Sequence, residues 1–155
     1  MNRKGQIATT LLVIAALILS GMALYTMISF NDDIRLQSAV LNRLTNDAVL
    51  LEEYVLEQAK VFGKDLVLTC PSCSREELKV KGQEFDVRRK TRPDGIGNFY
   101  GKLRNGEFTF KEQEGNFTLE IPNLLVQPEY KSNKIRRNFD LCLEFNQTGD
   151  YNKSC

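Results

Sequence analysis

Residues 6–30, QIATTLLVIAALILSGMALYTMISF, decide how this chain is organised, because they include no charged side chain. An α-helix rises about 1.5 Å per residue, so a helix of this length spans about 35 Å, enough to cross the hydrocarbon core of a bilayer. Its serine and threonine hydroxyls can hydrogen-bond to the helix backbone and are compatible with that position. The stretch therefore predicts a transmembrane helix that remains part of the protein.

The charges on either side of this run predict its orientation. Arg3 and Lys4 precede the run, whereas Asp32 and Asp33 follow it. Basic flanks stay on the cytoplasmic side, so we expect a single-pass protein of the cell membrane with a cytoplasmic N-terminus and an extracellular C-terminal part. The alternative is a secretory signal peptide cleaved near Gly21, but the apolar residues continue past the usual length of its core.

The next segment, residues 31–63, has apolar residues at every seventh position, with further leucines between them. This spacing predicts an amphipathic helix, and Gly63 suits its C-terminal cap. Its wide apolar face favours packing on a sheet of the same chain over a coiled-coil seam. The repeat consists of Ile34, Leu41, Ala48, Val55 and Phe62, with Leu44 and Leu51 at the intervening position.

Beyond Gly63, in residues 64–155, apolar and polar residues alternate as they do in β-strands. Asn105-Gly106 and Glu114-Gly115 predict the turns between neighbouring strands. The fold class is therefore expected to be α+β, with a long N-terminal helix packed on an extracytoplasmic, antiparallel, β-rich domain. The predicted strands lie in residues 65–70 (DLVLTC), 84–90 (EFDVRRK), 98–122 (a meander of three strands) and 137–145 (RNFDLCLEF).

The composition argues against several functional classes. The chain has 155 residues, a formal net charge of +1 and no histidine. Without histidine, the usual hydrolytic triad and imidazole metal sites cannot form, and a balanced charge is not typical of nucleic-acid binders. We therefore expect no enzymatic activity, no cofactor, no metal and no nucleic-acid partner.

Four cysteines, Cys70, Cys73, Cys142 and Cys155, predict two disulfides in an exported domain. A zinc site made of four thiolates and a redox-active Cys-Pro-Ser-Cys motif are the alternatives. Sequence alone does not decide among the three possible pairings. Bonds that join the first two cysteines to the last two are favoured, because each long loop would stabilise the fold by about 4 kcal/mol.

Other surface features concern modification and binding. Asn116, Asn146 and Asn152 begin N-x-S/T sequons and are predicted glycosylation sites. Two basic clusters, in residues 88–92 and 131–137, are expected to be solvated strand edges or loops. Their alternative role is to hold DNA, anionic surface polymers or an acidic neighbouring subunit.

The junction before the apolar run, Lys4-Gly5-Gln6, resembles the processing site of type IV pilin-like precursors, and glycine followed by glutamine is similar to archaeal class III signal peptides. In that family a membrane-embedded prepilin-type peptidase cuts after the glycine on the cytoplasmic side. The resemblance implies that residues 1–5 are a leader peptide and that Gln6 becomes the N-terminus. Many pilins carry glutamate at the fifth mature position, where this chain has Thr10. Archaeal flagellum-type filament proteins often lack that glutamate.

The resemblance implies a glycosylated, pilin-like structural subunit of a cell-surface filament or pseudopilus. Such a subunit would form a helical homo-oligomer through residues 6–30. One alternative is an unprocessed, single-pass, membrane-anchored extracytoplasmic binding domain. Another is a membrane-tethered thiol oxidoreductase that uses Cys70 and Cys73. The N-terminal residue of the native protein, Gln6 or Met1, separates the first two possibilities.

Overall fold

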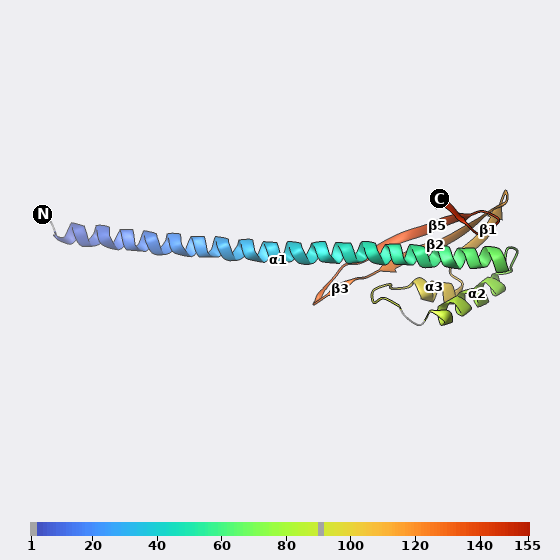
Figure 1. Ribbon diagram of the computed structural model, residues 1–155. Coiled ribbons are helices and arrows are strands. Elements are labelled where there is room, and N and C mark those ends of the chain that lie inside the picture. Colours follow the sequence, from blue (N-terminus) through green and yellow to red (C-terminus); the bar gives the residue numbers. More distant parts are fainter. Residues whose placement is uncertain (1–2, 90–91) are drawn as a thin grey trace. The chain divides into compact units, whose positions relative to one another are not determined.

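The computed structural model describes residues 3–89 and 92–155, with residues 3–11 described for the backbone alone (Figure 1). The chain divides into two compact units, Met1–Asn42 and Arg43–Cys155, which we call the N-terminal and C-terminal units. The fold class is α+β, as predicted, with a long N-terminal helix followed by an antiparallel sheet.

Helix α1 runs from Arg3 to Thr69 and contains 67 residues. The helices predicted for residues 6–30 and 31–63 therefore belong to one element. The prediction that Gly63 caps this helix is wrong, because the helix continues through it. The strand predicted for residues 65–70 is also wrong, since Leu66 and Val67 are buried as part of the helix.

In the N-terminal unit, α1 exposes its apolar side chains. Every large apolar side chain from Leu12 to Phe30 is exposed, including Leu12 at 70% and Phe30 at 68% of their maximum. Ile34 and Leu41, the first two members of the seven-residue repeat, are also exposed.

In the C-terminal unit, the same helix forms the spine of a hydrophobic core. Its buried residues recur mostly at spacings of three and four, as expected for one helix face. The predicted packing on the chain's own sheet is confirmed for this part of the helix. The buried apolar side chains are Leu44, Ala48, Leu51, Val55, Ala59, Phe62, Leu66 and Val67.

Two short helices replace strands that the sequence predicts. Helix α2 spans Arg75–Arg88, where a strand is predicted for residues 84–90, of which Lys90 lies outside the described residues. Ser74 and Glu77 form a reciprocal capping box at its start, a signal that favours helix.

Helix α3 spans Phe99–Asn105, where the sequence predicts the first strand of the meander. Gly106 adopts a left-handed conformation (φ 71°) as the C-terminal cap of α3, and its backbone N–H donates to the Leu103 carbonyl. The hairpin turn predicted at Asn105-Gly106 is therefore wrong.

Among the described residues, four strands form an antiparallel sheet in the order β1-β2-β5-β6, and β3 pairs with β4 in a small hairpin. The turn predicted at Glu114-Gly115 is confirmed, and both residues have positive φ angles. The strand predicted for residues 137–145 is confirmed with the same bounds. The strands are β1 Thr109–Gln113, β2 Asn116–Val126, β3 Glu129–Tyr130, β4 Asn133–Lys134, β5 Arg137–Phe145 and β6 Tyr151–Ser154.

The C-terminal part of α1 lies along β5. Arg137, at the start of β5, forms an ion pair with Glu52 at 3.0 Å. Gly63 faces the ring of Phe145 at the end of the strand. Lys64 reaches Asp150, in the loop that follows, at 3.2 Å. Contacts at both ends of β5 therefore hold helix and strand alongside each other.

Candidate functional site

The first candidate site is the apolar part of α1, which is long and apolar enough to cross a membrane. The hydroxyl of Ser20 donates to the Ala16 carbonyl at 2.8 Å, and that of Thr26 donates to the Ala23 carbonyl at 2.9 Å. These polar groups are therefore satisfied inside the helix, as a lipid environment requires. The segment can be covered by lipid tails or by other apolar helices.

The predicted cleavage point lies at the beginning of the same helix. Gly5, Gln6 and Thr10 belong to the backbone of α1, which begins at Arg3. Met1 and Asn2, which complete the leader peptide predicted for residues 1–5, lie outside the described residues.

The second candidate site comprises the four cysteines, which form two disulfides. Cys70 pairs with Cys73, with Cα atoms 5.2 Å apart, and Cys142 pairs with Cys155, with Cα atoms 5.3 Å apart. The pairing favoured from the sequence is wrong, because each bond joins cysteines that are local in the chain. The turn between α1 and α2 brings the first pair together. The antiparallel pairing of β6 with β5 brings the second pair together, and the Cys155 N–H donates to the Cys142 carbonyl.

Loss of the Cys142–Cys155 bond is expected to lower the free energy of unfolding by about 3 kcal/mol. Without the bond, the unfolded chain has more conformational entropy than the cross-linked one. The bond spans 13 positions of the chain. The variant Cys142→Ala with Cys155→Ala tests this in urea unfolding monitored by pulse proteolysis. The double variant has no Cys142–Cys155 bond, so reductant should not lower its free energy of unfolding through this pair. A variant as stable as the oxidised wild type would contradict the expectation.

The third candidate site is the set of acceptor asparagines, which lie at one end of the sheet. Asn116 begins β2, directly before Phe117, which pairs with Phe145 at the end of β5, and Asn152 lies on β6. Asn146 directly follows β5. Asn116 and Asn152 are exposed, and Asn146 is half-buried. Because Asn116 is distant in the sequence from Asn146 and Asn152, only the sheet pairing reveals that all three share one end of the domain.

The loop around Asn146 is well ordered by its own polar groups. The Asn146 side-chain oxygen accepts hydrogen bonds from the backbone N–H groups of Thr148 and Asp150 and from the Thr148 hydroxyl, at 3.0, 2.8 and 2.7 Å. Hydrogen bonds from the Thr148 hydroxyl and from Lys64 hold the pKa of the Asp150 carboxyl below its usual value. The loop is thereby tied to α1.

Several cations of the two basic clusters form ion pairs inside the C-terminal unit. Arg92 contacts the buried Asp86 carboxylate at 2.7 Å, and Lys134 contacts Glu129 at 2.8 Å. Lys90, in the first cluster, lies outside the described residues. These pairs satisfy part of the positive charge within the chain.

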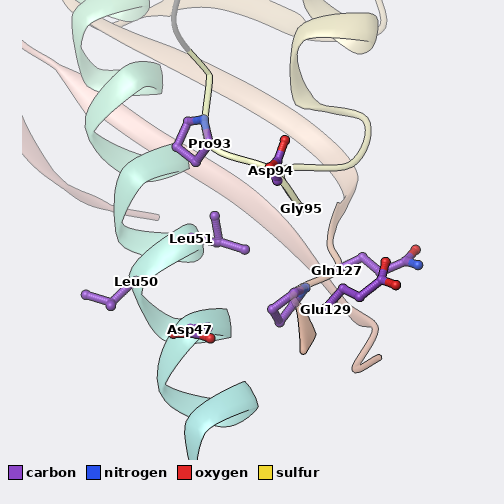
Figure 2. A pocket seen from close by; sticks show the side chains of 9 residues that line it. Asp47, Leu50, Leu51, Pro93, Asp94, Gly95, Gln127 and Glu129 are labelled. Atoms are coloured by element: carbon purple, nitrogen blue, oxygen red, sulfur yellow. The ribbon is translucent and has the colours of Figure 1, made fainter. Parts of the chain in front are cut away.

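A groove of about 640 Å³ lies between α1 and two loops of the C-terminal unit (Figure 2). Leu50, which is 62% exposed, and the acidic residues Asp47, Asp94 and Glu129 are among the residues that line it. The sequence patterns do not indicate this groove, because its walls come from three separate segments. The lining residues are Asp47, Leu50, Leu51, Pro93, Asp94, Gly95, Gln127, Pro128 and Glu129.

No protein-family model, curated protein or solved structure matches this chain.

Proposed function

We propose that this chain is a pilin-like structural subunit of a cell-surface filament or pseudopilus, with a structural rather than a catalytic role. One observation carries the proposal. A single helix, α1, supplies both an apolar segment whose large side chains are exposed from Leu12 to Phe30 and the buried spine of a folded domain from Leu44 to Leu66. A subunit that leaves the membrane for a filament needs these two parts in one chain.

The exposed segment makes the assembly step physically reasonable. Exposed apolar surface of this extent is unstable in water, so it requires lipid or other helices around it. Exchange of lipid contacts for contacts between helices costs little hydrophobic free energy, because both surroundings are apolar. Residues 6–30 would thus anchor the chain first and associate with other copies afterwards.

The other features fit a domain outside the cell. Arg3 and Lys4 favour retention of the N-terminus in the cytoplasm, so the C-terminal unit would be exported. Disulfides persist in such oxidising surroundings. Glycans on Asn116, Asn146 and Asn152 would extend from one end of the sheet.

Processing tests the proposal directly. The full chain, co-expressed with an archaeal prepilin-type peptidase and purified from membranes, is expected to begin at Gln6 when its N-terminal peptide is analysed by mass spectrometry. Gly5→Val should retain Met1, because the resemblance places the cut after this glycine. Gly21→Ala is the matched control, since an added Cβ meets nothing within 4 Å, and it should be processed like the wild type.

A second candidate function is an unprocessed, single-pass binding domain, and the groove beside Leu50 is the observation that favours it. In that case wild type and Gly5→Val would both retain Met1. Electron microscopy of the purified wild type would then show separate particles and no filaments.

A further inference from the structure

The proposed filament function does not use the chemistry of the Cys-Pro-Ser-Cys motif. We propose that the Cys70–Cys73 disulfide is a thiol-exchange site, which accepts two electrons from a dithiol on an extended segment of another exported polypeptide. Cys73 is the sulfur that the incoming thiolate attacks.

The two sulfurs of this bond differ in access. Cys70 is 2% exposed and belongs to the hydrophobic core, whereas Cys73 is half-buried at its margin. Cys73 also lines a surface cavity of about 440 Å³. Thiol exchange requires a thiolate to approach one sulfur directly, so access selects Cys73 as the attacked atom and Cys70 as the leaving group.

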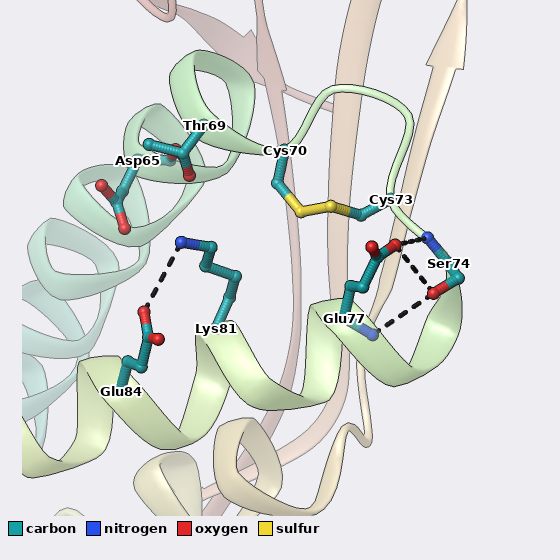
Figure 3. Close-up of a disulfide and its surroundings, with 8 residues drawn as sticks. All are labelled: Asp65, Thr69, Cys70, Cys73, Ser74, Glu77, Lys81 and Glu84. Carbon is teal, nitrogen blue, oxygen red and sulfur yellow. Dashed lines mark hydrogen bonds and ion pairs between the residues drawn. A yellow bond between two sulfur atoms is a disulfide. The ribbon is translucent and has the colours of Figure 1, made fainter.

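The surroundings of Cys73 carry positive charge. Ser74 caps the N-terminus of the 14-residue helix α2, whose backbone dipole is positive at this end (Figure 3). Arg75 and Lys111 line the same cavity as Cys73. Such surroundings attract the partner's thiolate to Cys73. They also stabilise the Cys73 thiolate that is released in the second step.

Negative groups also lie in the first turn of α2. The Glu77 carboxylate accepts hydrogen bonds from the backbone N–H and the hydroxyl of Ser74, at 2.8 Å each, and its charge is therefore partly satisfied (Figure 3). Glu76 is exposed to solvent, which screens it.

The cavity has a wall suited to an extended peptide. Phe108, Thr109, Phe110 and Lys111 line it, and the last three belong to β1. Among the described strands, β1 stands at the edge of the sheet and pairs with β2 alone. An open edge strand can add a further strand through its backbone, while the phenylalanine rings offer apolar contacts.

The exchange transfers two electrons from the partner dithiol to the Cys70–Cys73 disulfide. A partner thiolate forms a bond to the Cys73 sulfur, the Cys70–Cys73 bond breaks, and its electron pair leaves on Cys70, which takes up a proton. The second partner thiol, after losing its proton, attacks the partner sulfur of this mixed disulfide and releases Cys73 as a thiolate. The partner's two thiols become a disulfide, and Cys73 takes up the second of the two protons that they released, so that the pair in this chain becomes two thiols.

The second disulfide provides an internal comparison. Cys155 is exposed, more so than Cys73, so access to solvent alone would make its thiol the faster of the two. Single-thiol variants separate the effects: Cys70→Ala leaves Cys73 free, and Cys142→Ala leaves Cys155 free. In the full chain in detergent micelles, the Cys73 thiol should react with glutathione disulfide about tenfold faster than the Cys155 thiol.

Charge variants test the cause. Arg75→Gln and Lys111→Gln in the Cys70→Ala background should each slow the reaction of Cys73 about threefold at low salt. Lys153→Gln is the matched control, because Lys153 contacts Glu144 at the other edge of the sheet, and it should leave the rate unchanged.

The oxidised wild type supplies a test that does not depend on variants. After exposure to a limiting amount of a reduced, unstructured peptide with two cysteines, acid quenching and mass spectrometry should find the peptide on Cys73. A peptide attached to Cys70 or Cys155, a Cys155 thiol as fast as Cys73, or charge variants without effect would overturn the proposal. None of these readouts depends on cleavage after Gly5, so the filament function is tested separately.

Discussion

Replacement of Phe62 by alanine is expected to lower the free energy of unfolding of the C-terminal unit by about 4 kcal/mol, because it leaves a large cavity in the core. Phe62 is fully buried, and its ring lies 5.1 Å from that of Phe85 on α2 and 5.2 Å from that of Phe108, measured between centroids. One side chain of α1 thus contacts both the helical layer and the segment that enters the sheet.

The neighbouring residue supplies the control for this experiment. Val61 is 46% exposed, so Val61→Ala should lower the free energy of unfolding by less than about 1 kcal/mol. Both variants are measured in the full chain in detergent micelles, by pulse proteolysis across a urea series. Equal losses in Phe62→Ala and Val61→Ala would show that Phe62 does not hold the core together.

Replacement of Gly82 by alanine is expected to cost about 3 kcal/mol, because the added methyl group overpacks the contact between α2 and α3. A Cβ at Gly82 would come within 2.0 Å of the carbonyl oxygen of Leu103. That oxygen belongs to the backbone of α3, so relief requires one helix to move away from the other.

Gly101, on α3, is the matched control for Gly82. A Cβ there meets nothing within 4 Å, so Gly101→Ala should raise the free energy of unfolding by about 1 kcal/mol through helix propensity alone. Opposite signs in the two variants would demonstrate a close approach of the helices. A neutral Gly82→Ala would mean that the two helices can separate without loss of stability.

The elements with strong periodic patterns were predictable from the sequence. Residues 31–63 have a helical repeat, residues 6–30 form a long uncharged apolar run, and the strand at residues 137–145 alternates apolar and polar residues. Glu114-Gly115 forms a turn because both residues adopt positive φ angles there. In each case the local preference and the burial in the folded domain agree.

The wrong predictions arose where local signals conflict with packing. Gly63 looks like a cap, but it lies inside α1 because a glycine lets the helix approach Phe145 closely. Asn105-Gly106 suits a hairpin, yet the same glycine conformation also ends a helix, and burial of Phe99 and Leu103 favours α3. Ser74 and Glu77 do form a capping-box pattern, which could have indicated α2.

The candidate sites were predictable as residues but not as arrangements. The four cysteines and three sequons are visible in the sequence, whereas the disulfide pairing depends on how the chain turns. A disulfide forms between cysteines that the fold brings close enough together. The entropy of loop closure alone therefore does not determine the pairing. The cavity beside Cys73 likewise exists only once β1 and α2 are in place.

The local character of both disulfides has a mechanical consequence. Neither bond connects α1 to β2 or β5, so a pulling force between the helix and the sheet is resisted by noncovalent contacts, among them buried apolar side chains, ion pairs and the cation–π contact of Lys60 with Tyr151. Under sufficient tension the chain between them would unravel and lengthen by about 3.5 Å for each residue released. Only the loops closed at Cys70–Cys73 and Cys142–Cys155 would stay short. Stepwise release of this chain would dissipate mechanical load, while the backbone itself remains intact.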